Sequence, residues 1–415
     1  MSIIVFSSCA MNQEKKADRN TGPDTRPYRA VTRCASMHRR VSARNGFVKQ
    51  SHRVVTTDPR RVVCSEAMPD APVVRIGDDD SGRRLDRVLR KAFPAVPVGR
   101  IFRAIRSGEV RINGHRVPGS HRVASGDELR IPPAFSGEQS LTAEHSPSPD
   151  LPIEQRDRIV FANHDIVVVN KLAGELTHGE QSLETLVRRW APAPSGISFR
   201  IGPAHRLDRN TSGLIVFGIT RSGAEEAAAV FASGSVVKRY VALLGGRIET
   251  SAVWDEPLER DGSSMITRVH GREYSPQREY SPQREYSPQR EHSRAMAVTR
   301  VDPIATTETR TLAIVTIETG RTHQIRAHAA YHGHALCADV KYGGTGSGVP
   351  ARMANGKPFR RYLLHAASLT LRRPSQILGF DHLWAPPPPD SLRAIEALFG
   401  RRVLETLIET VAAHR

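Results

Sequence analysis

The stretch HRLDRNTSG, residues 205–213, places one carboxylate among cationic and hydroxyl side chains. In it, Asp208 lies between Arg206 and Arg209, and the apolar run LIVFGI follows directly. That run predicts a buried strand, so Asp208 is expected at the start of a rigid element. Neighbouring guanidinium groups favour the ionised form of a carboxylate. The pattern therefore predicts a charged carboxylate that is held at the start of a core strand, between two cationic side chains.

A second stretch, ETGRTHQIRAH at residues 318–328, supplies a candidate partner for that carboxylate. Gly320 ends a predicted strand, and Thr322 is expected to be the N-cap of the helix that follows. Gln324 and Arg326 would then project from the first turn of this helix. Arg326 is a candidate ion-pair partner for a carboxylate, although an ordinary surface arginine would show the same local pattern.

The signatures of several common enzyme classes are missing from the sequence. It contains no GxSxG elbow, no GxxxxGKS or GxxxxGKT phosphate loop, no HExxH and no GxGxxG, which argues against a common serine hydrolase, an NTPase and a dehydrogenase. Metal-ligating residue types do gather in one region, namely His323, His328, His332, His334, Cys337 and Asp339. His328 and His332 are four residues apart and could share a metal, but the spacing of a third ligand matches no established zinc pattern. We predict no metal site, and a histidine-metal hydrolase is the less favoured alternative.

Charge and composition indicate a protein that binds a polyanion. The 415 residues carry a net charge of +17. Residues 1–67 hold thirteen basic side chains against five acidic ones, and residues 82–131 hold twelve against four, so the rest of the chain is close to neutral. No stretch approaches the about 20 apolar residues of a membrane span. Four cysteines without a CxxC pair favour a reduced, cytosolic protein with neither a disulfide framework nor a thiolate metal site.

Residues 1–67 show no apolar periodicity and are rich in Arg, Ser and Thr, which predicts a disordered basic extension. Its apolar beginning, MSIIVFSSCAM, has no basic residues before it and is therefore not expected to be a signal peptide. An Arg-rich transit peptide is one alternative. Another is that translation begins at Met68, in which case the extension is a start-site artefact.

Residues 82–131 predict a small module of two helices and a small sheet. Apolar residues at helical spacing occur in RRLDRVLRKAF and in GRIFRAIRSGE, where Gly108 ends the second helix. Asn113-Gly114 predicts a tight turn, and DELRIP predicts a further strand. Three arginines repeat along the second helix, namely Arg100, Arg103 and Arg106. They predict a basic binding surface, with an ordinary solvated helix face as the alternative.

The stretch 132–152 is a linker by its Pro, Ser and Gly content, and residues 153–415 form a larger body. Val-, Ile- and Leu-rich runs bounded by glycine predict more strands than helices in this body, without regular alternation. That pattern favours an α+β fold with a mixed, mainly antiparallel sheet. A six-residue repeat, REYSPQ, has a proline in each copy and predicts an expanded surface loop at residues 272–291. The stretch 390–414 is predicted to be helical.

Taken together, the motifs resemble those of the RluA superfamily of pseudouridine synthases, and of its C-type members most closely. The resemblance is carried by HRLD with TSG, then KRY at 238–240, TGRTHQIR at 319–326 and LLHA at 363–366. The module at residues 82–131 resembles the S4 RNA-binding domain. The resemblance covers about residues 80–400. It implies a small α/β S4-like domain followed by a catalytic domain of the pseudouridine synthase fold.

The resemblance implies a role for each matching residue. Asp208 corresponds to the catalytic aspartate, and Arg326 to the arginine that pairs with it, with a guanidinium able to form two parallel hydrogen bonds to a carboxylate. Tyr240 corresponds to the tyrosine that stacks on the flipped base, and Leu364 to an apolar residue that packs near it. Arg206 corresponds to the arginine that enters the RNA stack where the target uridine leaves. Phosphate contacts are implied for Arg100, Arg103 and Arg106.

Pseudouridine formation breaks the bond between ribose C1′ and uracil N1 and joins C1′ to C5, so it imports no group and changes no oxidation state. The resemblance therefore implies that no cofactor is needed. The implied partner is 23S ribosomal RNA or a ribosomal assembly intermediate, and we predict a cytoplasmic monomer without membrane contact. The alternative function is a ribosome-associated RNA-binding protein that keeps the fold without catalysis. The presence of Asp208, Tyr240 and Arg326 argues against that alternative.

Overall fold

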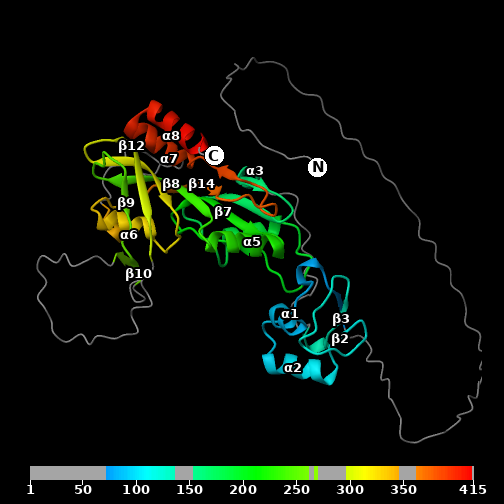
Figure 1. Ribbon diagram of the computed structural model, residues 1–415. Helices are drawn as coiled ribbons and strands as arrows, with labels where there is room; N and C mark the ends of the chain where they lie inside the picture. Colours follow the sequence, from blue (N-terminus) through cyan, green and yellow to red (C-terminus); the bar gives the residue numbers. More distant parts are fainter. Residues whose placement is uncertain (1–71, 136–152, 261–265, 270–295, 345–360, 414–415) are drawn as a thin grey trace, which may run out of the picture. The chain divides into compact units, whose positions relative to one another are not determined.

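The computed structural model describes residues 72–135, 153–260, 266–269, 296–344 and 361–413 (Figure 1). The predicted basic extension 1–67, most of the predicted linker 132–152 and the REYSPQ repeat at 272–291 lie outside the described residues. Among the helices of the described residues, none is both long enough and apolar enough to span a membrane.

The first described part, residues 72–135, is a small α/β domain with two helices and a three-stranded antiparallel sheet. Its helices are α1 (Leu85–Ala92) and α2 (Val98–Ser107), which confirms both helices predicted from apolar spacing. Its strands pair in the order β1-β3-β2 and are β1 (Val73–Arg75), β2 (Arg111–Ile112) and β3 (Glu128–Arg130). The tight turn at Asn113-Gly114 is also confirmed, since both residues have positive φ, 51° and 78°.

Segments on both sides of the predicted module 82–131 pack against it. β1 precedes residue 82 and pairs with β3. Beyond residue 131, the 3-10 helix η2 (Pro133–Phe135) carries Phe135, which is buried with its ring 5.5 Å from that of Phe93. The sequence around these two segments does not predict that they belong to the domain. β1 is only three residues long, and Phe135 lies in a polar, Pro-rich stretch. Both belong to the domain through contacts with residues distant in sequence.

The remaining described residues form a larger part, with these strands and helices. The strands are β4 (Ile159–Ala162), β5 (Ile166–Lys171), β6 (Gly202–Pro203), β7 (Ser212–Gly218), β8 (Val236–Gly245), β9 (Ala252–Trp254), β10 (Leu258–Arg260), β11 (Thr267–Val269), β12 (Thr299–Thr306), β13 (Arg310–Ile317), β14 (Leu364–Leu371) and β15 (His382–Trp384). The helices are α3 (Ile153–Arg156), α4 (Leu183–Trp190), α5 (Arg221–Ala232), α6 (Gln324–Tyr331), the 3-10 helix η4 (Val340–Tyr342), α7 (Pro389–Phe399) and α8 (Arg401–Ala413).

This larger part is built on one ten-stranded sheet, while β10 and β11 form a separate pair. Eight strands follow one another in the order β4-β5-β7-β14-β8-β13-β12-β9, with β6 paired to β7 and β15 paired to β14. All of these pairs are antiparallel except β7 with β14. The mixed, mainly antiparallel α+β fold predicted from the strand-rich pattern is thus confirmed.

Helices cover both faces of the sheet, as the alternation of side chains along β8 shows. Tyr240 and Ala242 belong to a core cluster that also holds residues of α4 and α6. Val241 and Leu243 belong to another cluster, with residues of α7 and α8, which lie side by side in Figure 1. Tyr240 therefore points to the α4/α6 face of the sheet, away from the C-terminal helices.

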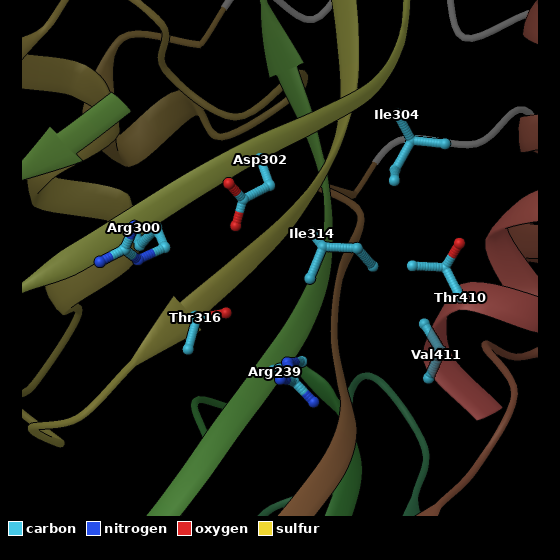
Figure 2. Close-up of a pocket in the computed structure, with 8 residues that line it drawn as sticks. All are labelled: Arg239, Arg300, Asp302, Ile304, Ile314, Thr316, Thr410 and Val411. Atoms are coloured by element: carbon cyan, nitrogen blue, oxygen red, sulfur yellow. The ribbon is translucent and has the colours of Figure 1, made fainter. Parts of the chain in front are cut away.

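The opposite face carries a pocket of about 260 Å³ between β8, β12 and β13 and the end of α8 (Figure 2). Its lining comprises Arg239, Arg300, Asp302, Ile304, Ile314, Thr316, Thr410 and Val411. Arg239 directly precedes Tyr240 on β8, so the two side chains point to opposite faces of the sheet. None of the residues predicted for the catalytic site lines this pocket, and Tyr240 and Leu364 lie instead in the cluster on the α4/α6 face.

Candidate active site

Asp208 lies in the loop directly before β7, where the backbone N–H of Thr211 donates to its carbonyl at 3.1 Å. The strand that follows is buried along its whole length. Within it, Gly213 has a φ of 121°, and a Cβ at this position would come within 2.3 Å of the backbone of Ala366 in β14. Only glycine permits this close contact, so the TSG of the motif serves the packing that holds Asp208 in place.

The structure brings Arg326 of α6 to Asp208, 118 residues away in sequence. Its Nη1 donates to Asp208 Oδ2 at 3.1 Å, and the two side chains are 7% and 21% exposed. The predicted pair of parallel hydrogen bonds to Asp208 is wrong. That twofold contact is made to Asp339, whose carboxylate accepts from Nε at 2.7 Å and from Nη2 at 2.8 Å. The reason is tertiary, because the loop after α6 brings a second carboxylate to the other side of the guanidinium.

Two tyrosine rings complete the surroundings of Arg326. The guanidinium carbon lies 4.8 Å from the ring centre of Tyr342 and 4.7 Å from that of Tyr362. Burial disfavours the charged form of Arg326, but its hydrogen bonds with Asp339 and the nearby negative charges outweigh this effect and raise its pKa. Burial also raises the pKa of Tyr362 to about 12. Arg326 is therefore a permanent cation in contact with neutral aromatic rings.

Tyr240 and Leu364 lie in the apolar cluster next to this ion pair, together with Tyr362. Tyr240 is 8% exposed, and its pKa is raised by burial and, to a smaller extent, by the charge of Asp208. Leu364 is 5% exposed. The structure thus gathers four of the predicted residues, Asp208, Arg326, Tyr240 and Leu364, in one region, while their individual roles stay predictions.

The arginines expected to contact RNA occur in both parts of the chain. Arg206 lies within the HRLD motif and is exposed. On α2 of the small domain, Arg103 and Arg106 are exposed. Arg100 is instead half-buried and pairs with Glu109 at 2.6 Å. Of the three arginines on α2, Arg103 and Arg106 are therefore the better placed to meet a phosphate.

A lysine that sequence reasoning missed supports the loop that holds Asp208. Lys171, at the end of β5, is 0% exposed. Its ammonium donates to the backbone carbonyls of Leu172 and Arg209, both at 2.9 Å, and so ties this loop to β5. Burial lowers the pKa of Lys171 to about 8, although the charges of Glu175 and Asp208 oppose the shift. The signal that could have found it is a lysine placed directly after the apolar run IVVVN.

Helix α6 begins differently from the prediction. Its N-cap is His323 and not Thr322, and no side chain caps the first turn. His323 adopts a left-handed conformation with a φ of 54°, which is uncommon outside glycine and often marks a functional position. Its Nδ1 lies 2.8 Å from the Tyr342 hydroxyl, and its Nε2 lies 3.8 Å from Asp208 Oδ2. Burial lowers the pKa of His323 more than the charge of Asp208 raises it, so the ring is neutral at pH 7.

The histidines considered as metal ligands are engaged in other contacts. The ring nitrogens of His328 lie 2.8 Å from Thr299 Oγ1 and 3.0 Å from the carbonyl oxygen of Glu256. His332 pairs with the Glu256 carboxylate at 3.0 Å and stacks on Trp254. In the part of the chain that the structure describes, no group of three or more His, Cys, Asp or Glu residues is placed to hold a metal ion. The described histidines therefore lend no support to the metal-hydrolase alternative.

Comparison with known proteins gives matches in both parts of the chain. The sequence profile of the family described as RNA pseudouridylate synthase matches residues 165–331, and that of the S4 domain matches residues 83–129. The chain is 29% identical over 316 residues to the ribosomal large subunit pseudouridine synthase C of Vibrio vulnificus, which covers 75% of this chain and 91% of that protein. It is 30% identical over 312 residues to the protein of the same name from Escherichia coli, with 74% and 90% covered. Among solved structures, human RNA pseudouridylate synthase domain containing 1 aligns with a TM-score of 0.42 and 21% identity, over 61% of this chain and 94% of that chain.

Proposed function

Because the chain belongs to the family of RNA pseudouridylate synthases and carries an S4 domain ahead of the synthase part, we propose that it converts specific uridines of large-subunit (23S) ribosomal RNA to pseudouridine. The observation that carries this proposal is the ion pair between Asp208 and the buried Arg326. Tyr240 lies near this pair, and the charge of Asp208 contributes to the raised pKa of its phenol. The names of the two relatives support large-subunit ribosomal RNA as the substrate.

The proposed reaction needs a carboxylate that stays ionised in a pocket. The bond between C1′ and N1 breaks, the base turns, and C1′ joins C5, while the proton lost from C5 balances the one gained at N1. Asp208 would act on the ribose, either by attacking C1′ or by removing a proton from C2′. Both routes require the anionic carboxylate, and the guanidinium of Arg326 places a positive charge 3.1 Å from it. Within the described residues, Oδ1 of Asp208 accepts no hydrogen bond, so this oxygen is available to the substrate.

The target base must leave the RNA stack to reach Asp208, at a cost of a few kcal/mol. Stacking of the base on Tyr240 would return about 1–3 kcal/mol. The phenol of Tyr240 is neutral at pH 7, as in any tyrosine, and burial raises its pKa further, so the ring would meet the uracil without a negative charge. Leu364 would contact the base with its apolar side chain, and the exposed Arg206 would fill the place that the base leaves in the RNA.

A ribosome-associated RNA-binding protein without catalysis is the second candidate, and the S4 domain alone would suit it. The surroundings of Asp208 favour the enzyme. Removing two carboxylates and a guanidinium from water is costly, and RNA binding as such does not need this cluster. We further propose that the protein acts as a monomer, since Asp208, Arg326 and Tyr240 meet within one chain. We also propose that it works in the cytoplasm, and that it needs no cofactor or metal because the reaction imports no group and changes no oxidation state.

Carbodiimide labelling of ribosomal RNA from a strain that lacks this gene tests the function, because isomerisation leaves the mass of uridine unchanged. We expect specific pseudouridines of the large-subunit RNA to disappear and to return when the wild-type chain is supplied. An unchanged labelling pattern, together with intact binding to this RNA, would instead support the non-catalytic RNA-binding protein.

Replacing Arg103 and Arg106 together by Gln is expected to weaken RNA binding, because both side chains are exposed on α2. The logarithm of the binding constant falls linearly with the logarithm of the salt concentration. The slope of this line should become shallower by about 1 for each phosphate contact that the variant loses. The dissociation constant for a ribosomal RNA fragment, measured at several salt concentrations, gives this slope. Replacing Arg401 and Arg402 on α8 by Gln removes the same charge and serves as the control. Equal weakening in both variants would mean that only the net charge matters.

A further inference from the structure

Asp339 holds the guanidinium of Arg326 more closely than Asp208 does. Its carboxylate accepts from Nε at 2.7 Å and from Nη2 at 2.8 Å, whereas Asp208 accepts one hydrogen bond, from Nη1 at 3.1 Å. Asp339 is 2% exposed. We infer that Asp339 is a positioning residue that orients Arg326, so that the guanidinium contacts a single oxygen of Asp208. This inference rests on the proposed function.

Arg326 needs such a partner because its side chain has several rotatable bonds. One hydrogen bond to Asp208 does not define the plane of the guanidinium, whereas two parallel hydrogen bonds to a carboxylate do. The rings of Tyr342 and Tyr362 lie 4.8 and 4.7 Å from the guanidinium carbon and attract it without a directed hydrogen bond. The direction in which Nη1 points therefore depends on Asp339.

The loop that carries Asp339 is attached to the sheet. The N–H of Asp339 donates to the carbonyl of Leu336, and the N–H of Cys337 donates to the carbonyl of Leu243 in β8, both at 3.0 Å. Between them, Ala338 has a φ of 65°, a left-handed conformation that is unfavourable for a residue with a Cβ. Because the surrounding fold maintains this conformation, the side chain of Asp339 starts from a defined position.

The arrangement leaves Asp208 with an available oxygen. If the guanidinium of Arg326 met Asp208 through two parallel hydrogen bonds, both carboxylate oxygens would be occupied. With Asp339 in that place, Oδ2 of Asp208 accepts from Arg326, and Oδ1 accepts no hydrogen bond from the described residues. Asp339 thereby allows one carboxylate to have both a cationic neighbour and an oxygen directed to the substrate.

Asp339→Asn tests the inference. The side-chain amide of the new asparagine has one oxygen that accepts and one NH2 group that donates. A guanidinium can only donate, so at least one of the two hydrogen bonds from Arg326 is lost. We expect kcat for pseudouridine formation in a ribosomal RNA fragment to fall roughly 10- to 100-fold, with KM within about twofold of wild type. Asp390→Asn is the matched control, because Asp390 accepts a hydrogen bond from Arg361 at 2.6 Å and should leave kcat unchanged. A wild-type kcat in Asp339→Asn would overturn the inference.

A double-mutant cycle with Arg326→Met separates positioning from a merely structural role. If Asp339 acts through Arg326, Asp339→Asn lowers kcat in the wild-type background and causes no further loss in the Arg326→Met background. A structural role would lower kcat by the same factor in both backgrounds, and that result would contradict the inference.

Asp339→Glu keeps the charge but moves the carboxylate, and it covers the case in which the Asn variant does not fold. If Asp339 positions Arg326, this variant has a lower kcat and an unchanged KM. A wild-type kcat would reject the positioning role. The wild-type protein in the same assay distinguishes a failure of the proposed function from a failure of the positioning role. A wild type that forms no pseudouridine rejects the proposed function, whereas an active wild type with equally active Asp339 variants rejects only the positioning role.

Discussion

Asp208→Asn is expected to abolish isomerisation, with turnover falling by on the order of 10³-fold or more, while RNA binding changes less than about threefold. The neutral amide can neither attack C1′ nor take a proton from C2′. It has nearly the same size as the carboxylate, and the side chain is 21% exposed, so little packing is lost. Binding depends mainly on the attraction between basic side chains and phosphates, and this change leaves that attraction intact.

The measurement is pseudouridine formation under single-turnover conditions, alongside the dissociation constant for the same RNA fragment. Asp165→Asn provides a control with the same change of charge, at a carboxylate that accepts hydrogen bonds from the hydroxyls of Thr220 and Ser222. Its turnover should match that of wild type. Substantial turnover by Asp208→Asn would assign the chemistry to another residue and remove the basis of the proposed mechanism.

Arg326→Met is expected to reduce both activity and stability. Asp339 is 2% exposed, and without Arg326 its carboxylate would be buried without the cation it pairs with in the described part of the chain. Losing one partner of a buried ion pair costs about 3–5 kcal/mol in the free energy of unfolding. Turnover should fall by roughly 10²-fold or more, because Asp208 loses the hydrogen bond and the positive charge that Nη1 of Arg326 supplies beside the reacting ribose.

Denaturant unfolding of wild type and variant measures the loss of stability. Adding Asp339→Asn to Arg326→Met should recover part of it, because the amide no longer needs a cation. Arg361→Met is the control, since the Arg361–Asp390 pair is 17% and 15% exposed and should cost less. If Arg326→Met unfolded at the wild-type denaturant concentration, the buried ion pair would not be a major source of stability.

Many local features of the fold could be predicted from the sequence. The apolar spacing in residues 85–93 and 101–105 predicts α1 and α2, and the glycine at position 108 ends α2 with a φ of 79°. These features depend on side chains only a few residues apart, so they can be read without knowing the fold. The candidate site was found through its motifs, and the structure brings Asp208 and Arg326 within 3.1 Å of each other.

Other features depend on contacts between residues that are distant in the sequence. Lys171 ends an apolar strand, and only the packed structure shows that its ammonium binds the carbonyl of Arg209 in the loop of Asp208. The N-cap of α6 was predicted as Thr322 because its hydroxyl suits that position, but the backbone at His323 turns into the left-handed region instead. Contacts of His323 with Tyr342 and Asp208 accompany this conformation.

The sequence by itself determined the candidate carboxylate, the candidate guanidinium and the elements that carry them, because residue types, periodicity and turn residues act over short stretches of chain. Only the tertiary structure decided that Asp339 takes the two parallel hydrogen bonds of Arg326 while Asp208 takes one. The partner of a hydrogen bond is selected by distance and direction, and these exist only after α6 and the loops around it have packed against the sheet.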